Sequence, residues 1–246
     1  MKKIIKILLP FSLTISLVSC NSQNIQSVDL NSLNPVTVNA VNKNTDSKSK
    51  KEIFEKIRNF LANQAITKTS KTKKLKNDLS PSELLRLSYD SDPRVRASVA
   101  MNPNLDSSRI MSLSYDSDSY VRACTALNPN LDTSRLLSLS YDSDYRIRCY
   151  TVINQKLDTS RLLSLSYDSD IKVRACTAIN PNLDTSRLLS LSYDSEALVR
   201  GFTTLNPNLD SSRRTSLTYD SDSFVKECIA AGPANAYSFL PRLQLF

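Results

Sequence analysis

Hydrophobic residues recur along most of this 246-residue chain in short helical patterns that repeat at a fixed spacing. From Leu79 a leucine returns every 26 residues, at Leu105, Leu131, Leu157, Leu183 and Leu209. A strict period of this length predicts a solenoid in which each unit buries its apolar face against its neighbours. We therefore expect six units, followed by residues 235–246 as a C-terminal cap. The units are 79–104, 105–130, 131–156, 157–182, 183–208 and 209–234.

Within each unit the pattern predicts two short helices. In the first unit Ser80 is an N-cap, Pro81 takes the first helical position and Glu83 completes a capping box. Later units place an aspartate at the same cap: Asp106, Asp132, Asp158, Asp184 and Asp210. The second helix begins after Ser-Asp and ends before Asn-Pro, since a residue that precedes proline avoids the helical region. With two glycines and no alternating apolar runs, a β-solenoid is disfavoured.

The joint between the two helices is the heptapeptide SLSYDSD and its near-copies. It could be a calcium loop, but such a loop needs further oxygen ligands and a glycine, which the joint lacks. We interpret its last acid as the N-cap of the second helix, favouring the positive end of the helix dipole. These caps are Asp92, Asp118, Asp144, Asp170, Glu196 and Asp222. A basic residue four positions on is in reach for an i,i+4 pair. The tyrosine column of the joints predicts packing between units through a bonded hydroxyl, with a binding ladder as the alternative.

The segment SDPRVRASVAMNPN at Ser91–Asn104, preceded by SELLRLSYD, resembles the leucine-rich repeat variant, a bacterial relative of HEAT-type repeats. The resemblance covers 79–234 and loosens in later units. It implies an all-α, right-handed, armadillo-type superhelix of alternating α- and 3₁₀-helices. The longer period here favours a fuller α-helix as the second element. A family relative holds an iron–sulfur cluster on N-terminal cysteines that this chain lacks, so no cofactor is expected.

The N-terminus reads MKKIIKILLPFSLTISLVSC, a basic segment followed by a short apolar one. This pattern is typical of a secretory signal peptide, here 1–19. Its end, LVSC, resembles the lipobox of bacterial lipoproteins, which implies cleavage before Cys20 and acylation, including palmitate, of that cysteine. An ordinary cleaved signal is the alternative. The chain is then anchored by lipid to the cell membrane or outer membrane and faces the extracytoplasmic side.

Residues 20–50 carry no period and predict a flexible tether. Residues 51–78 hold a basic amphipathic helix and linker, in which Ile53, Phe54, Ile57, Phe60 and Leu61 share one face. We expect this helix to dock on the first repeat as an N-terminal cap; a helix lying on anionic lipid is the alternative.

Charge and composition mostly exclude functions. The net charge is +8, but 79–246 carries 18 basic and 19 acidic residues, so the basic excess belongs to the N-terminal part and nucleic-acid binding gains no support. The chain has no His and only two Gly, which excludes histidine-based catalysis and glycine-rich phosphate loops. We therefore expect no enzyme, and no small-molecule substrate is evident.

Four cysteines lie in the repeats: Cys124, Cys149, Cys176 and Cys228. Three of them share one position in alternate units, too far apart to pair with one another. We expect small buried thiols; a disulfide or metal site is the alternative.

The positions that vary most between units lie four residues apart on the second helices and share one face. They form a stripe of aromatic and basic residues, the variable stripe, which is our candidate partner site. Its members are Arg94, Tyr120, Arg146, Tyr150, Lys172, Leu198, Phe202 and Phe224. Irregular core filling is the alternative. The sequence thus predicts a lipid-anchored, non-catalytic protein-binding or scaffold module for an unknown protein partner, or else a structural lipoprotein that assists assembly of an envelope complex or uptake machine.

Overall fold

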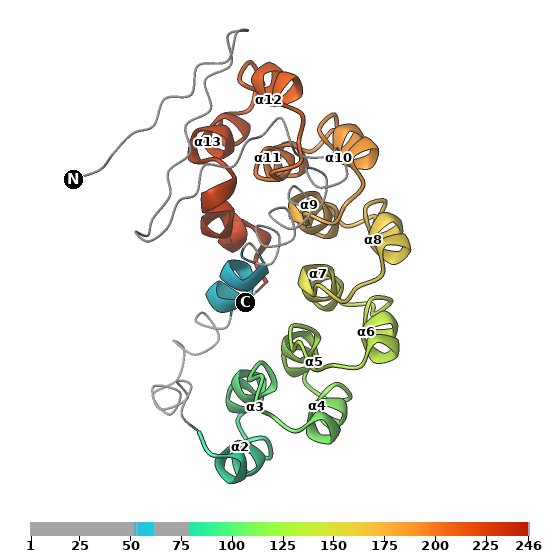
Figure 1. Cartoon of the computed structure of the whole chain (residues 1–246), viewed down its shortest axis with the longest axis vertical. Helices are drawn as coiled ribbons and strands as arrows, with labels where there is room; N and C mark the ends of the chain where they lie inside the picture. The colour runs from blue at the N-terminus through green and yellow to red at the C-terminus, as the bar shows by residue number, and fades with distance from the viewer. Residues whose placement is uncertain (1–51, 53, 62–78, 246) are drawn as a thin grey trace, which may run out of the picture. The chain divides into compact units, whose positions relative to one another are not determined.

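The computed structural model describes residue 52, residues 54–61 and residues 79–245, all within one compact unit, 45–246. The signal peptide 1–19, the lipidation site Cys20, the tether 20–50, Ile53 and the linker 62–78 lie outside the described residues. In the part that is described, every regular element is a helix (Figure 1).

Helix pairs follow one another with the predicted period, and a 3₁₀ segment follows the last pair. The first helices are α2 (Pro81–Leu87), α4 (Ser107–Leu113), α6 (Thr133–Leu139), α8 (Thr159–Leu165), α10 (Thr185–Leu191) and α12 (Ser211–Leu217). The second helices are α3 (Pro93–Ala100), α5 (Ser119–Ala126), α7 (Tyr145–Ile153), α9 (Ile171–Ile179), α11 (Ala197–Thr204) and α13 (Ser223–Ala231). The 3₁₀ segment is η3 (Pro233–Leu243). Both helices of each pair are α-helical, so the expected fuller second helix is confirmed.

The helices begin at the residues that the capping pattern predicts. Ser80 and Glu83 form a capping box at α2, and the five later aspartates accept backbone N–H groups at the starts of the other first helices. Aspartates cap the second helices in the same way. Glu196 makes no side-chain capping bond at α11. Its longer side chain suits the cap position poorly, since Ser, Thr, Asp and Asn are the residues that fit there.

The helices form two rows (Figure 1). Each second helix packs against the second helix of the next unit, from α3 to α13, whereas each first helix packs mainly on its partner within the unit. We call the first helices the outer row and the second helices the inner row. A helix of seven residues is too short to be stable alone in water. The outer row therefore depends on leucines such as Leu136 and Leu139, both buried against the inner row.

The C-terminal residues do not extend the outer row. Within the C-terminal cap, 235–246, the residues Tyr237, Phe239, Leu240 and Leu243 predict part of a seventh first helix, broken by Pro241. In the structure, however, the chain turns after Gly232, with φ of 69°, into η3 and packs on α13 and α9. The positive φ is open to glycine and strained for other residues, and Pro233 cannot continue α13. Leu240, Leu243 and Leu245 are fully buried there.

The N-terminal helical segment, residues 54–61, also differs from its predicted place on the first repeat. Its apolar face is buried, with Phe54, Ile57 and Leu61 part of the core. Phe54 lies with Leu127 and Ile153 of the second and third units, and the Phe60 ring lies 6.1 Å from the Tyr237 ring. The physical reason is that η3 supplies an apolar surface in the middle of the array. The two ends of the described unit therefore meet on the inner row.

Candidate functional site: the joints and the variable stripe

Each YDSD joint gives its two aspartates different tasks. In the second unit Asp116 accepts a hydrogen bond from the backbone N–H of Asp118 at 2.9 Å. Its two carboxylate oxygens also accept one bond each from the guanidinium of Arg96 in the first unit, at 2.8 and 2.9 Å, which we call the two-bond contact. Asp118 then caps α5. Burial would raise the pKa of Asp116, but the bonds from Arg96 and Asp118 hold that pKa below its usual value. The joint is therefore a polar connection between neighbouring units.

The arginines of the second helices thus pair with the next unit, which corrects the predicted i,i+4 pair. Arg148 repeats the two-bond contact with Asp168, and a third nitrogen donates to the carbonyls of Asp142 and Ser143. Since the cap aspartate is already engaged with backbone N–H groups, the planar guanidinium finds a better partner across the joint. The last unit has no further joint to meet, and there the exposed Lys226 replaces the arginine.

The tyrosine of each joint lies at the surface. Tyr141 is 65% exposed, and the guanidinium of Arg161 lies 3.5 Å from its ring centroid. Arg161 also donates to the hydroxyl and carbonyl of Ser140. The same stack recurs at Tyr89, Tyr115, Tyr167 and Tyr193. The tyrosines do connect units, but through a cation–π contact on the ring face where a bonded hydroxyl was expected.

A third connection runs through buried asparagines that the sequence marked only as helix stops. The Asn128 amide is fully buried and donates to the carbonyls of Ala100, at 2.7 Å, and Asn102, at 3.0 Å, in the preceding unit. Asn154, Asn180 and Asn206 repeat the bond to the preceding unit. A buried amide left without partners would be costly, so each asparagine requires a neighbour in register.

The variable stripe is closed over much of its length. Tyr150 and Phe202 are 1% and 0% exposed, so at these two positions the alternative of core filling holds. Leu198 and Phe224 are partly buried against the core. Arg94 is exposed, while Tyr120, Arg146 and Lys172 are half-buried. Tyr120 also packs partly against the core. We call Arg94, Tyr120 and Arg146, from the first three units, the open part of the stripe, because the C-terminal contacts described below fall on Tyr150, Lys172 and Phe224.

The chain's own C-terminal segment closes the stripe. The Tyr150 hydroxyl donates to the carbonyl of Leu245 at 3.4 Å. Lys172 donates to the side-chain oxygen of Gln244 at 3.0 Å, and the Phe224 ring meets Phe239 edge-on at 5.9 Å. The closed part of the stripe is therefore covered by the chain's own C-terminal segment.

Sequence reasoning missed Tyr145, which joins this contact. Its hydroxyl donates to the carbonyl of Gln244 at 3.0 Å, and Lys172 donates to the same hydroxyl at 3.1 Å. One signal was present in the sequence. Tyr145 opens its second helix at a position where the other units have Pro, Ser, Ile or Ala.

Gly201 also belongs to the closed part. A Cβ at this position would meet the Phe224 ring at 2.5 Å, so only glycine lets the ring lie so close. Phe202 and Phe224 are then 6.2 Å apart between centroids. Aromatic pairs at this separation add to the energy of burial.

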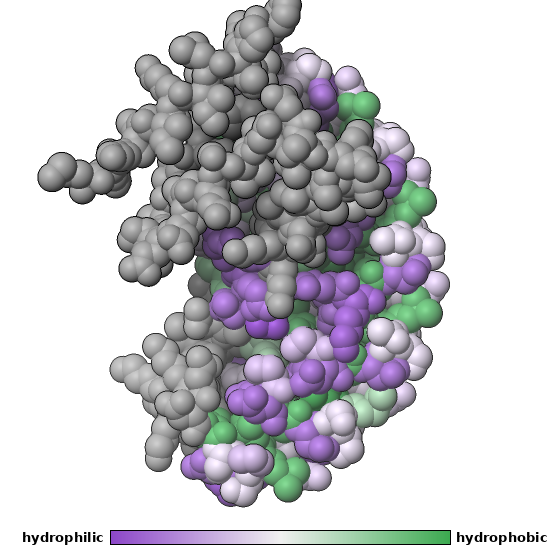
Figure 2. All heavy atoms as spheres, in the orientation of Figure 1, coloured by the Kyte–Doolittle hydropathy of each residue, from purple (hydrophilic) through white to green (hydrophobic). Residues whose placement is uncertain are grey.

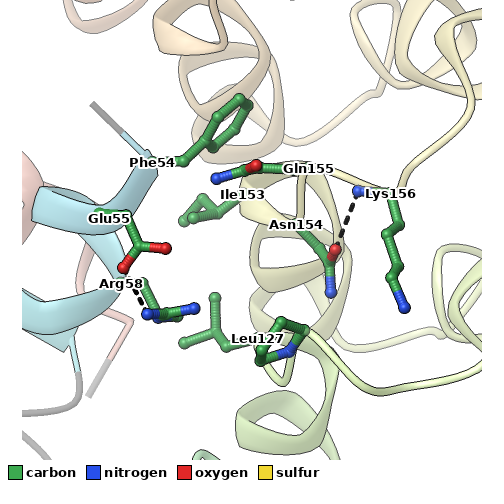
Figure 3. A pocket seen from close by; sticks show the side chains of 9 residues that line it. Phe54, Glu55, Arg58, Leu127, Ile153, Asn154, Gln155 and Lys156 are labelled. Atoms are coloured by element: carbon green, nitrogen blue, oxygen red, sulfur yellow. Dashed lines mark hydrogen bonds and ion pairs between the residues drawn. The ribbon is translucent and has the colours of Figure 1, made fainter. Parts of the chain in front are cut away.

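A cavity of about 330 Å³ lies where the N-terminal helical segment meets the inner row. Figure 3 shows Phe54, Glu55 and Arg58 on one side, and on the other Leu127 and the loop residues up to Lys156. Glu55 and Arg58 pair with each other. The lining is mixed and includes no nucleophile beside a base, so it offers no catalytic arrangement.

The four cysteines of the repeats are buried and free, as expected. Burial raises the pKa of Cys228 to about 12 and also raises the pKa of Cys124 and Cys149. The latter thiol lies beside Cys176 of the next unit. Because the thiolate is the reactive form, thiols held protonated by burial are inert.

Across 54–61 and 79–245, no group of three or more His, Cys, Asp or Glu side chains is placed to hold a metal ion. No helix in these described ranges is long and apolar enough to cross a bilayer.

These features define the class of protein: an α-solenoid of 26-residue helix pairs, joined by repeated polar contacts. No family model matches the chain, and no curated protein matches it. Among solved structures it is similar to "a leucine-rich repeat variant with a novel repetitive protein structural motif", with 26% identity, a TM-score of 0.45, and coverage of 80% of this chain and 84% of that chain. The solenoid itself is established by the chain's own helix pairs and contacts.

Proposed function

We propose that this chain is a non-catalytic binding or scaffold module, held by lipid on Cys20 at an extracytoplasmic membrane surface, and that its open stripe receives a protein partner. One observation carries the proposal. The repeated polar side chains of the framework bond one unit to the next, whereas Arg94, Tyr120 and Arg146 differ from unit to unit and keep part of their side chains at the surface.

The open stripe has the composition of a binding surface. Tyrosine and arginine are enriched in the energetically important parts of protein interfaces. Arg94 is exposed, and Tyr120 takes the equivalent position in the second unit, between the units of Arg94 and Arg146 along the inner row. Arg146 pairs with Asp144 at 2.6 Å, which holds its guanidinium in place. A partner with an acidic, partly apolar surface suits this set of side chains.

The anchor rests on the sequence, where LVSC ends a basic and apolar leader. Attachment to a membrane would raise the local concentration of the binding surface for partners on the same membrane. Detergent-phase partitioning of the wild type and of Cys20→Ala tests the anchor. Partitioning of both proteins into the aqueous phase would contradict it.

Affinity capture on cells that contain the wild-type chain, followed by crosslinking, tests the partner site. We expect a partner crosslinked to α3 and α5, and its loss in the double variant Arg94→Ala, Tyr120→Ala. Lys226→Ala removes a cation at the other end of the inner row and serves as the matched control. Changes at Tyr150 and Phe202 are unsuitable, since these side chains are core. Retention of the same partners by the double variant would refute the open stripe as the site.

A further inference from the structure

The interior of the inner row holds a pair of thiols that the polar connections between units do not use. Figure 2 shows small hydrophobic patches between hydrophilic ones on one face of the molecule. The two thiols take no part in such a surface, since Cys149 of α7 and Cys176 of α9 are both 0% exposed. Their helices are neighbours in the inner row (Figure 1). Cys176 follows Cys149 by one unit of 26 residues and one residue more.

Residues with this spacing face each other at another contact between second helices. Gly201 and Cys228 occupy the equivalent positions two units further on, and α11 and α13 begin in the same register as α7 and α9. A Cβ at Gly201 would lie 3.2 Å from the sulfur of Cys228. In a disulfide each Cβ lies about 3 Å from the opposite sulfur. The stacked geometry therefore places Cys149 and Cys176 at a separation that a disulfide can bridge.

The surroundings of Cys149 agree with this placement. The pKa of the Cys149 thiol is raised first by burial and then by its contact with the Cys176 thiol. The Phe224 ring, which leaves room only for glycine at Gly201, is replaced here by Lys172. The Lys172 side chain extends to the C-terminal segment. The space that the ring fills beside Gly201 is therefore open to the side chain of Cys149.

Comparison of the units shows that packing does not require a cysteine at this position. The first member of each facing pair is otherwise alanine or glycine, so a small side chain is sufficient for the close approach of the helices. The other pairs are Ala97 with Cys124, Ala123 with Tyr150, Ala175 with Phe202, and Gly201 with Cys228. Two cysteines face each other in this register only between the third and fourth units. A reactive group thus stands where packing needs only a small one.

We propose that Cys149 and Cys176 form a disulfide that crosslinks the third and fourth units when the chain folds in the presence of a disulfide oxidant. The oxidant is a small disulfide such as oxidised glutathione, or a protein of the dithiol oxidoreductase class. The structure describes the reduced chain, in which all four thiols of the repeats are free. The crosslink is separate from the open stripe, so either proposal can fail without the other.

The reaction proceeds by two exchanges. One thiol loses its proton and attacks the disulfide of the oxidant, which releases the first oxidant thiol and leaves a mixed disulfide. The second cysteine then loses its proton, attacks the mixed disulfide and releases the second oxidant thiol. The pair loses two protons and two electrons, and the oxidant gains them as two thiols. Because a buried thiol stays protonated, the exchange takes place before α7 and α9 close on each other.

The crosslink would join the two units that hold the end of the chain. The Tyr150 hydroxyl of the third unit donates to Leu245, and Lys172 of the fourth unit donates to Gln244. These bonds can form together only while the two units keep their relative positions. Oxidation would therefore fasten the closed part of the stripe.

Refolding of the full chain, purified in detergent, tests the pair. The chain is unfolded in denaturant with a reductant and refolded in a mixture of oxidised and reduced glutathione. After an acid quench and alkylation of the remaining thiols, trypsin releases Cys149 in the peptide 149–156 and Cys176 in the peptide 175–187. Mass spectrometry should find these two peptides joined, about tenfold or more above any other cysteine pair, because folding brings these two thiols together. Alkylation of both thiols, or links spread evenly among the cysteines, would overturn the proposal.

The repeats supply matched controls. Cys149→Ala introduces the residue that three other units have at this position, and Cys124→Ser introduces the residue of the first unit, Ser98. The oxidised wild type and oxidised Cys124→Ser should each melt about 5–10 °C above the reduced form, since the crosslink closes a long loop. Cys149→Ala should melt at one temperature under both conditions. An equal rise in Cys149→Ala, or no rise in the wild type, would contradict the crosslink.

A second measurement covers a chain that refolds poorly. Exported to a bacterial periplasm, where disulfides form and persist, the chain folds in the presence of an oxidant without prior unfolding. Acid denaturation, alkylation and the same peptide map should show the link in the wild type and in Cys124→Ser. Free thiols at both Cys149 and Cys176 in the exported wild type would refute the proposal.

Discussion

The connection between units can be measured by comparing two arginines at equivalent positions, Arg148 and Arg122. Arg148 donates to both oxygens of Asp168, at 2.8 and 2.9 Å, and their side chains are 14% and 10% exposed. Arg122 keeps its two carbonyl bonds, at 2.9 and 3.1 Å, but lies 3.7 Å from Asp142. Methionine at either position keeps the side-chain stem and removes the charge.

Breaking a buried pair by removing one partner costs about 3–5 kcal/mol, and for this partly buried pair we expect about 2–3 kcal/mol for Arg148→Met. Arg122→Met loses mainly two carbonyl bonds, about 1–2 kcal/mol. The difference of about 1 kcal/mol corresponds to about 2–4 °C in melting temperature.

Urea unfolding followed by circular dichroism at 222 nm would compare the two variants, since the midpoint falls in proportion to the loss of unfolding free energy. Arg148→Lys is the control, because lysine keeps the positive charge but cannot make two parallel bonds to a carboxylate. It should recover only part of the lost free energy of unfolding. Equal destabilisation by Arg148→Met and Arg122→Met would refute the claim that the two-bond contact is what connects the units.

Four further outcomes follow from the same contacts. The pKa of Asp116 and of Asp194 is lower in the folded chain than its unfolded value near 3.9. The contribution of each group to the free energy of unfolding is therefore complete above that unfolded value and is lost as the pH falls through the folded pKa. Urea midpoints should drop below about pH 4, and less steeply in Arg96→Met. Glu196→Asp supplies the missing cap at α11 and should raise the free energy of unfolding by about 0.5–1 kcal/mol, measured by the same titration. Gly201→Ala should destabilise by about 1–3 kcal/mol in thermal melts, with partial recovery when Phe224→Leu is added, because the new Cβ overlaps the ring. The four buried cysteines should be inert to a thiol reagent in the folded chain and react on unfolding; reaction of the native protein would contradict their burial.

What the sequence predicts well is local. A cap involves a side chain and backbone N–H groups two or three residues away, so Ser80, Asp106 and Asp118 could be assigned from spacing alone. The period itself predicts the stack because each unit has only its neighbours to bury against. The partner of Arg96 was misassigned for a physical reason: residues four and twenty positions away are both in reach, and only the stacked geometry decides between them.

The closed part of the stripe could not be predicted from its own residues. Tyr150 and Phe202 look like either a binding face or core, and the choice depends on what the chain does after Gly232. A Gly-Pro pair directly after the last second helix was the available signal, since a left-handed glycine followed by proline redirects the chain. Phe239, Leu240 and Leu243 fit part of a seventh first helix equally well.

The C-terminal segment also decides how long the array can be. The joints offer the next unit contacts of the same kind, an arginine facing the aspartate of the next joint, so the joints themselves do not set the number of units. Residues 239–245, however, reach Phe224 of the sixth unit, Lys172 of the fourth and Tyr150 of the third together. The C-terminal segment thereby fixes the number of units. In a longer or shorter array it could not reach all three contacts at once, and its leucines would lose the surface on which they are buried.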